Sequence, residues 1–210
     1  MDLHEIMSTN GTCRYFKPDA LADEVLLEVL SAARWAPSGG NRQPVTFVAV
    51  QDEGKKAKLK DLYLPIWNEY MESVQAGSQR IGARPKVLED ADHFANHLEL
   101  IPVHLVVCAD LSGVHPTDLE LDRLSVVGGA SIYPAVQNVL LAARARGLGA
   151  ALTTLHASVE PQVKSLLQIP AELAVVAVVM LGWPAKAFPK KLTRRPVEEI
   201  AFKDTYGHQI

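Results

Sequence analysis

The residues Ala36–Pro44, which read A-P-S-G-G-N-R-Q-P, join two elements of different kinds. Before them, Leu21–Trp35 is predicted as an amphipathic helix, because its apolar residues recur at every third or fourth position. Pro37 disfavours helical geometry in the residue before it, and two glycines follow, so the helix ends there. After them, the β-branched and aromatic run Val45–Val50 predicts a short buried strand.

The same stretch has a composition that would suit a ligand. Small residues let a flat molecule approach the backbone, and the amides of Asn41 and Gln43 can each donate and accept hydrogen bonds. An ordinary loop with two turns has this composition as well. Both interpretations stay open on the residues alone, and the ordinary loop is the favoured one.

The remaining elements are unevenly spaced along the chain. Helices are predicted at Asp52–Gln79 (broken near Pro65), Ala83–His97, Val126–Gly147 (the longest) and Glu160–Leu167, and strands at Leu100–Ala109, Ala150–Leu155 and Ala174–Leu181. Such unequal insertions between strands favour an α+β fold over a regular doubly wound sheet. The polar tail Lys190–Ile210 is too extended to pack on the core of its own chain.

Length and charge exclude several classes of protein. The chain has 210 residues, of which 48% are hydrophobic and 21% charged, so we expect one folded domain over residues 1–210. The 21 Lys and Arg against 24 Asp and Glu give a net charge of −3. This balance argues against nucleic acid as a partner, because phosphate binding needs a basic face.

The compartment is inferred from what is missing. Cys13 and Cys108 lie far apart without a C-x-x-C pattern, which indicates a reducing environment and neither disulfides nor structural zinc. Apolar stretches are too short to span a membrane, and the first residues lack a secretory signal. A cytoplasmic protein without membrane partners is expected.

Familiar catalytic motifs are also missing, including H-E-x-x-H, G-x-S-x-G and a Walker-type phosphate loop. His93 and His97 have a spacing that can ligate a metal, but a solvated polar face is favoured because no third ligand is evident. Cys13 lies beside Arg14, which should lower the pKa of the thiol. No metal site and no nucleophile are predicted.

Four elements resemble those of the FMN-dependent nitroreductase family. The loop Ala36–Pro44 resembles its A-P-S-x-x-N-x-Q-P signature, and Thr12–Phe16 is similar to its N-terminal basic element. Gln137–Ala143, running into G-L-G, resembles its central helix. Leu181–Pro184 followed by Arg194–Glu199 resembles its C-terminal end. These elements stand in the family's order over nearly the whole chain.

The resemblance implies a fold and an assembly. The implied fold is α+β and nitroreductase-like, with a central, mostly antiparallel sheet flanked by helices. The implied assembly is a homodimer with FMN at the interface and a C-terminal tail exchanged between subunits. Residues 61–97 correspond to a variable lid that shapes substrate access, and no binding residue is transferred from them.

The resemblance also implies which residues hold FMN. Thr12, Arg14 and Arg194 match positions around the phosphate, while Asn10 stands where the family has a basic residue, so one cation is missing. Around the flavin ring, the matching positions on the loop are Pro37, Ser38 and Gly39, which usually come from the other subunit. The amides of Asn41 and Gln43 suit either the polar edge of the ring or the stabilisation of the loop itself. The segment with Leu155, His156 and Ala157 follows the strand after G-L-G, where the family places a backbone N–H near N5.

The implied activity is a ping-pong oxidoreduction. NADH or NADPH gives hydride to FMN N5 and leaves, and a nitroaromatic, quinone or similar small acceptor then takes it. No side chain acts as acid or base, because the flavin carries the chemistry. Two alternatives remain: a specialised dehydrogenase or dehalogenase on the same scaffold, and a protein that sequesters flavin with little turnover.

Overall fold

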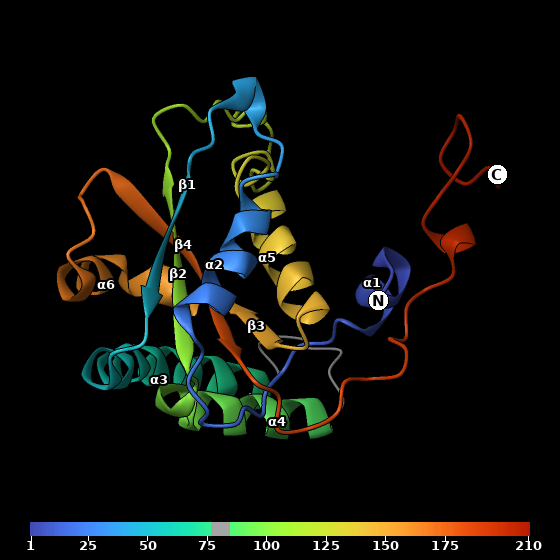
Figure 1. The fold of residues 1–210 in the computed structure, drawn as a ribbon. Coiled ribbons are helices and arrows are strands. Elements are labelled where there is room, and N and C mark those ends of the chain that lie inside the picture. Colours follow the sequence, from blue (N-terminus) through green and yellow to red (C-terminus); the bar gives the residue numbers. More distant parts are fainter. Residues whose placement is uncertain (77–84) are drawn as a thin grey trace.

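The computed structural model, which describes residues 1–76 and 85–210, is built on one antiparallel sheet of four strands (Figure 1). The strands are β1 (Val45–Val50), β2 (Val103–Asp110), β3 (Gly149–Thr153) and β4 (Leu173–Gly182), in the order β1-β2-β4-β3. The α+β fold with an antiparallel sheet is therefore confirmed.

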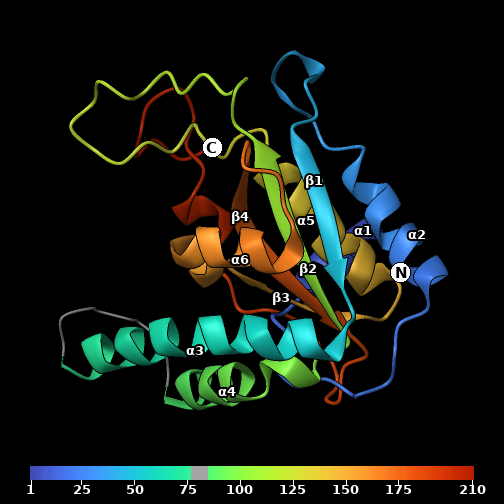
Figure 2. The same ribbon diagram turned by 90° about the vertical axis from the view of Figure 1, so that its left-hand side faces the viewer.

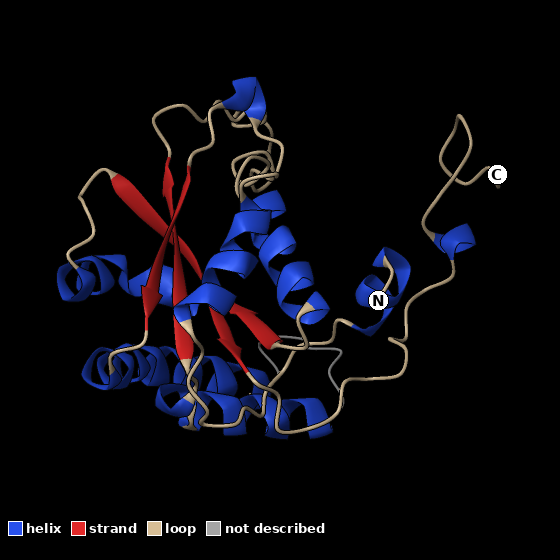
Figure 3. Ribbon diagram, viewed as in Figure 1, coloured by secondary structure: helices blue, strands red, loops and turns tan. Residues whose placement is uncertain are grey.

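Helices flank both faces of this sheet (Figure 3). They are α1 (Leu3–Thr9), α2 (Asp23–Ala33), α3 (Glu53–Gln75), α4 (Pro85–Asn96), α5 (Tyr133–Ala145) and α6 (Glu160–Leu167), with short 3-10 turns η1 (Gly39–Asn41), η2 (Leu98–Leu100), η3 (Leu155–Val159) and η4 (Val197–Glu199). No helix in the described ranges is both long enough and apolar enough to cross a membrane.

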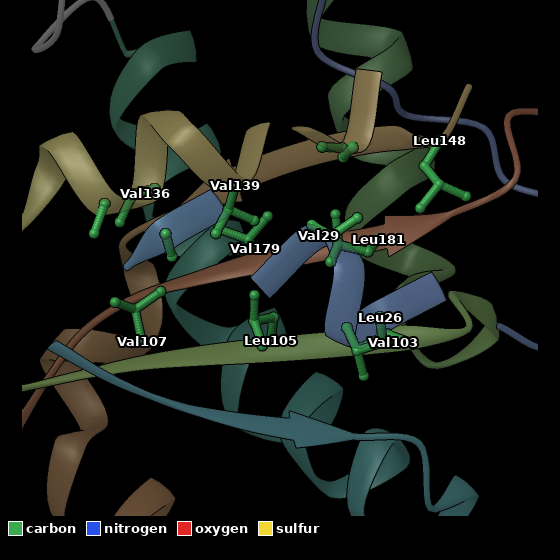
Figure 4. Packing of buried hydrophobic residues seen from close by; sticks show 14 of the residues in the cluster. Leu26, Val29, Val103, Leu105, Val107, Val136, Val139, Leu148, Val179 and Leu181 are labelled. Atoms are coloured by element: carbon green, nitrogen blue, oxygen red, sulfur yellow. The ribbon is translucent and has the colours of Figure 1, made fainter. Parts of the chain in front are cut away.

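Alternation along the strands divides the core into two clusters. Val103, Leu105 and Val107 of β2 point toward α2 and α5, where they meet an aliphatic cluster (Figure 4). Val106 and Cys108 point the other way, into a second cluster with α3, α4 and α6. In Figure 2, α3 and α4 run side by side at one end of the sheet, and α6 lies above them.

The predicted break at Pro65 does not occur. Helix α3 is continuous over 23 residues and contains this proline in its interior. Leu59, Tyr63 and Trp67, spaced by four residues on both sides of Pro65, are all buried. Their packing against the sheet offsets the backbone hydrogen bond that a proline removes. The predicted residues 77–79 of this helix lie outside the described residues.

Helix α5 was predicted seven residues too long at its start. It begins at Tyr133, with Pro134 in its first turn, and has 13 residues, so α3 is longer. Val126–Ile132 forms turns because Gly128 and Gly129 disfavour a helix and a proline suits a helix start. At the other end, Gly147 has a φ of 78°, as expected for the residue that stops the helix.

The other boundaries agree more closely. β1 and α6 have the predicted bounds, whereas β2 begins three residues late because Leu98–Leu100 forms η2. Helix α4 covers most of Ala83–His97, although residues 83 and 84 lie outside the described residues. Helix α1, capped by the Asp2 carboxylate, was not predicted.

The C-terminal tail stays off the core, as expected. Leu192 N donates to Ser8 O at 2.8 Å, so the tail is attached beside α1. Beyond that point it extends away from the sheet (Figure 1). Several of its apolar side chains are exposed. Val197, Ile200 and Tyr206 are 60%, 58% and 90% exposed. Nothing in a single protomer covers these groups within the described residues.

Candidate functional site

Two segments that lie far apart in sequence meet beside the start of β3. Cys13 N donates to Ala150 O at 2.9 Å, and Ala185 N donates to Tyr15 O at 2.9 Å. Between residues 11–15 and 184–189 they enclose a cavity of about 170 Å³. Thr12 and Arg14, both predicted as phosphate-binding residues, line this cavity.

Lys186 lines the same cavity and was not predicted. Its Nζ lies 3.0 Å from the centroid of the Tyr15 ring, a cation–π contact. The Tyr15 hydroxyl donates to Asp90 Oδ1 at 2.6 Å, and this hydrogen bond lowers the pKa of Asp90, helped by nearby lysines and Arg14. The cavity thus combines two cations with one carboxylate that is already bonded. In the sequence, the one signal for Lys186 is its position two residues after Pro184, the last residue of the element Leu181–Pro184.

Arg14 also lies close enough to Tyr63 of α3 for its charge to act on the Tyr63 hydroxyl. Burial raises the pKa of the Tyr63 hydroxyl, and a hydrogen bond with Thr153 and the charge of Arg14 partly offset that rise. Thr153 is the last residue of β3, and η3 with Leu155, His156 and Ala157 follows directly. The structure therefore attaches the N-terminal candidates at the start of β3 and places the η3 candidates after its end, so both groups lie along the same short edge strand.

Within η3, the side chain of His156 is turned into the core. It is fully buried, its Nε2 lies 3.0 Å from Leu59 O, and its ring stacks at a tilt against Tyr63. Burial lowers the pKa of His156 to about 4. A ligand over η3 can meet only the backbone at this position, together with the exposed Ala157 and the half-buried Leu155. Leu155 N has one long contact, 3.4 Å to Thr153 Oγ1.

The loop with Pro37, Ser38 and Gly39 is held by its own polar groups. Gln43 N donates to Ser38 Oγ at 3.0 Å, and Gly39 N donates to Ser131 Oγ at 3.0 Å. The side-chain amide of Gln43 donates through Nε2 to Asn41 Oδ1 at 3.3 Å, so in this structure the two side chains stabilise the loop itself. Asn41 and Gln43 adopt φ values of 53° and 50°, a left-handed conformation that non-glycine residues adopt at a cost. A cavity of about 510 Å³ lies between residues 37–42, 113–115 and 127–131.

These two groups of candidates lie at opposite ends of β2. Val103 pairs with Leu181, which pairs in turn with Ala150, where the N-terminal segment is attached. At the other end, Asp110 N donates to Pro44 O, next to the loop. Eight strand residues separate them, or roughly 25 Å. One protomer therefore does not bring both groups to a single ligand.

Arg194, the third predicted phosphate contact, lies on the exposed tail. Its guanidinium donates to Thr193 O at 2.8 Å, and it does not line the cavity of Thr12 and Arg14. The lower pKa predicted for the Cys13 thiol is wrong, because burial raises that pKa. His93 and His97 stack on each other at 4.2 Å, and the described residues hold no cluster suited to a metal.

Comparisons with known proteins show a similarity over most of the chain. The model of the nitroreductase family matches residues 11–183. A 5,6-dimethylbenzimidazole synthase of Rhodospirillum rubrum is 30% identical over 84% of this chain and 79% of its own length. An FMN reductase [NAD(P)H] of Bacillus subtilis is 24% identical over 97% of this chain and 74% of its own. An oxidised iodotyrosine deiodinase bound to FMN and 3-iodo-L-tyrosine superposes with a TM-score of 0.74, at 25% identity, over 98% of this chain and 100% of that one.

Proposed function

This chain belongs to the nitroreductase family of oxidoreductases, and from that membership we propose that it is an FMN-dependent enzyme. In this proposal it uses NADH or NADPH to reduce nitroaromatics, quinones or similar small acceptors by a ping-pong mechanism. The observation that carries the proposal is the cavity in which Thr12, Arg14 and Lys186 come together. The similarity to an FMN reductase and to an FMN-bound deiodinase supports it.

The residues of this cavity fit the needs of a flavin phosphate. A phosphate group near pH 7 carries almost two negative charges and binds best to guanidinium, ammonium and hydroxyl donors. Arg14 and Lys186 supply the charges, and Thr12 supplies a hydroxyl. The carboxylate in the cavity, Asp90, accepts a hydrogen bond from Tyr15, which limits its repulsion of an anion.

When bound, FMN supplies hydride transfer between the nicotinamide and the acceptor. The chain supplies position and electrostatics. Arg14, whose charge acts on the neighbouring Tyr63, stabilises negative charge on the ligand, and the backbone N–H of Leu155, which has one long contact, is a donor that the ligand can use. No side chain is proposed as acid or base, and His156 stays neutral near pH 7 because burial holds its pKa at about 4.

A second copy of the chain completes the site in this proposal. Pro37, Ser38 and Gly39 lie at the far end of the sheet from Arg14, so they would contact a flavin held by the other subunit. The exposed apolar tail gives the partner a surface to cover. Residues 1–210 act as one domain in each subunit, with 61–97 as the lid, since α4 reaches the cavity through Asp90; residues 77–84 of this segment lie outside the described residues.

A second candidate is a specialised reaction on the same scaffold, such as reductive dehalogenation of a halogenated phenol. The observation that favours it is the similarity over the whole solved chain of an iodotyrosine deiodinase. Iodide release from 3-iodo-L-tyrosine, measured beside reduction of a quinone, distinguishes the two activities.

The purified protein tests the proposal directly. We expect a yellow protein with a flavin spectrum that NADH or NADPH bleaches without oxygen and that a quinone restores. A colourless protein whose spectrum and melting temperature do not respond to added FMN contradicts the proposal. Bleaching without reoxidation by any acceptor indicates a flavin-sequestering protein instead.

Mixed variants test the shared site. Arg14→Gln and Gly39→Val each damage one half of every site in a homodimer. If the halves come from different subunits, mixing the two variants rebuilds one intact site in each heterodimer, or about a quarter of all sites after random exchange. If both halves belong to one protomer, mixing restores nothing. Each variant alone, unfolded and refolded in the same way, is the control.

A further inference from the structure

Arg144 is a buried cation that the family resemblance does not assign. It lies in the last turn of α5 and is 8% exposed, although arginine is among the residues least often buried. Its neighbour in the same turn, Arg146, is exposed and pairs with Glu28 at 2.8 Å. The two arginines therefore lie at the same end of α5 but have different surroundings.

The surroundings of Arg144 lead to the cavity of Thr12 and Arg14. Its guanidinium lies 4.0 Å above the ring of Phe188, which lines that cavity. Its Nε donates to Thr9 Oγ1 at 3.1 Å, and the Thr9 hydroxyl donates to Glu5 O at 2.7 Å. Thr9 directly precedes Asn10, so the guanidinium lies beside the position where the basic residue is missing.

The charge of Arg144 is incompletely compensated. It forms no ion pair with a carboxylate in the described part of the chain, where Nε is also its one guanidinium nitrogen with a hydrogen-bond acceptor. The C-terminal end of α5 offers about half a negative charge, and the Phe188 ring adds a cation–π contact. Neither equals a full anion, and burying a cation without one is costly.

We propose that Arg144 is a positioning residue for the phosphate of the cofactor. Its buried charge, behind Phe188, adds positive potential to the cavity of Thr12, Arg14 and Lys186 and replaces the cation that Asn10 does not provide. The inference rests on the proposed function, because FMN is the ligand that brings the phosphate. Riboflavin has the same ring without the phosphate, so it separates this electrostatic role from a structural one.

The experiment measures the affinities of FMN and riboflavin for Arg144→Gln by quenching of flavin fluorescence. Glutamine keeps an amide that can donate to Thr9 and lie on Phe188, but it removes the charge. We expect FMN to bind about tenfold more weakly and riboflavin to bind with unchanged affinity, since only FMN carries the phosphate charge. Arg146→Gln is the matched control and should leave both affinities unchanged.

Two results overturn this role for Arg144: equal losses for FMN and riboflavin, which show a structural role, or no loss for either. Wild-type protein that binds neither flavin contradicts the proposed function itself. Arg144→Lys is the second variant and decides the matter if the glutamine variant does not fold. Because it keeps the charge, its preference for FMN over riboflavin should stay within about threefold of wild type; loss of that preference contradicts the inference.

Discussion

The two faces of the sheet are buried equally well but differ in chemistry. The buried side chains on the face toward α2 and α5, among them Leu105 and Val139, are all aliphatic (Figure 4), and the partly buried Phe47 and Trp183 pack against them. The face toward α3, α4 and α6 contains tyrosine, tryptophan and two fully buried histidines, His104 and His156. Each histidine bonds a backbone carbonyl through Nε2, at 2.8 Å to Leu98 O and at 3.0 Å to Leu59 O.

This difference shows which part of the fold is sensitive to pH. The aliphatic face has no group that titrates, so its contribution to stability is independent of pH. The other face holds two imidazoles whose Nδ1 atoms have no partner in the described residues, together with the buried Lys56, whose Nζ donates to Ile101 O at 3.1 Å. Arg14 and η3 also lie on this side, so the proposed site shares the sensitive face.

The largest effect is expected from acidification. Burial lowers the pKa of His104 to about 3 and that of His156 to about 4. Between pH 6.5 and these values the unfolded chain binds protons that the folded chain does not, so stability falls as the pH falls. Each histidine should remove roughly 3 kcal/mol of the free energy of unfolding by pH 4. Urea unfolding measured from pH 7 to pH 4 checks this.

The matched variants are His156→Gln and His104→Gln, which keep a donor to the carbonyl and do not titrate. Each should flatten the pH dependence, while His115→Gln, at an exposed position, should leave it unchanged. If the unfolding free energy of both core variants depends on pH as steeply as that of the wild type, the two histidines are not the cause of the pH dependence.

The next effect lies on the aliphatic face. Leu105→Ala removes a fully buried side chain and should lower the free energy of unfolding by about 3 kcal/mol. Because its neighbours do not titrate, the loss should be the same at pH 7 and pH 5. Leu124→Ala, at a position 89% exposed, is the control and should change stability by less than about 0.5 kcal/mol. A loss of unfolding free energy that is larger at pH 5 than at pH 7 would contradict the proposed difference in pH sensitivity between the two faces.

The smallest effect concerns the tail, which belongs to neither face. Arg194→Ala should weaken FMN binding by about 1.5–3 kcal/mol if the tail brings its guanidinium to a phosphate. Stability at pH 7 without FMN should not change, since Arg194 is exposed and, among the described residues, bonds only Thr193 O. Unchanged FMN affinity in a fluorescence titration would assign Arg194 to the solvated tail.

Local patterns predicted the elements that have local causes. The β-branched run of β1 and the periodic pattern of α6 gave the observed bounds, and Gly147 marked the end of α5. The start of α5 was misplaced although local residues set it, whereas two other errors arose where distant contacts override a local signal. Packing on both sides of Pro65 keeps α3 whole, and burial, not the neighbouring Arg14, controls the thiol of Cys13. Lys186 and Arg144 were missed because their roles depend on residues far away in sequence.

By itself the sequence determined the family, the α+β class and the stretches that carry the candidate site, since these depend on residue types in a fixed order. Tertiary structure decided which side each residue faces. Strand β2 is buried on both faces from Val103 to Ala109, so its residue pattern does not show which face meets which helices. Only the packing of α2, α5 and α3 decides that Leu105 points one way and His104 the other. The same packing places Arg14 and the Pro37–Gly39 loop at opposite ends of the sheet, because strand pairing sets positions that no local pattern contains.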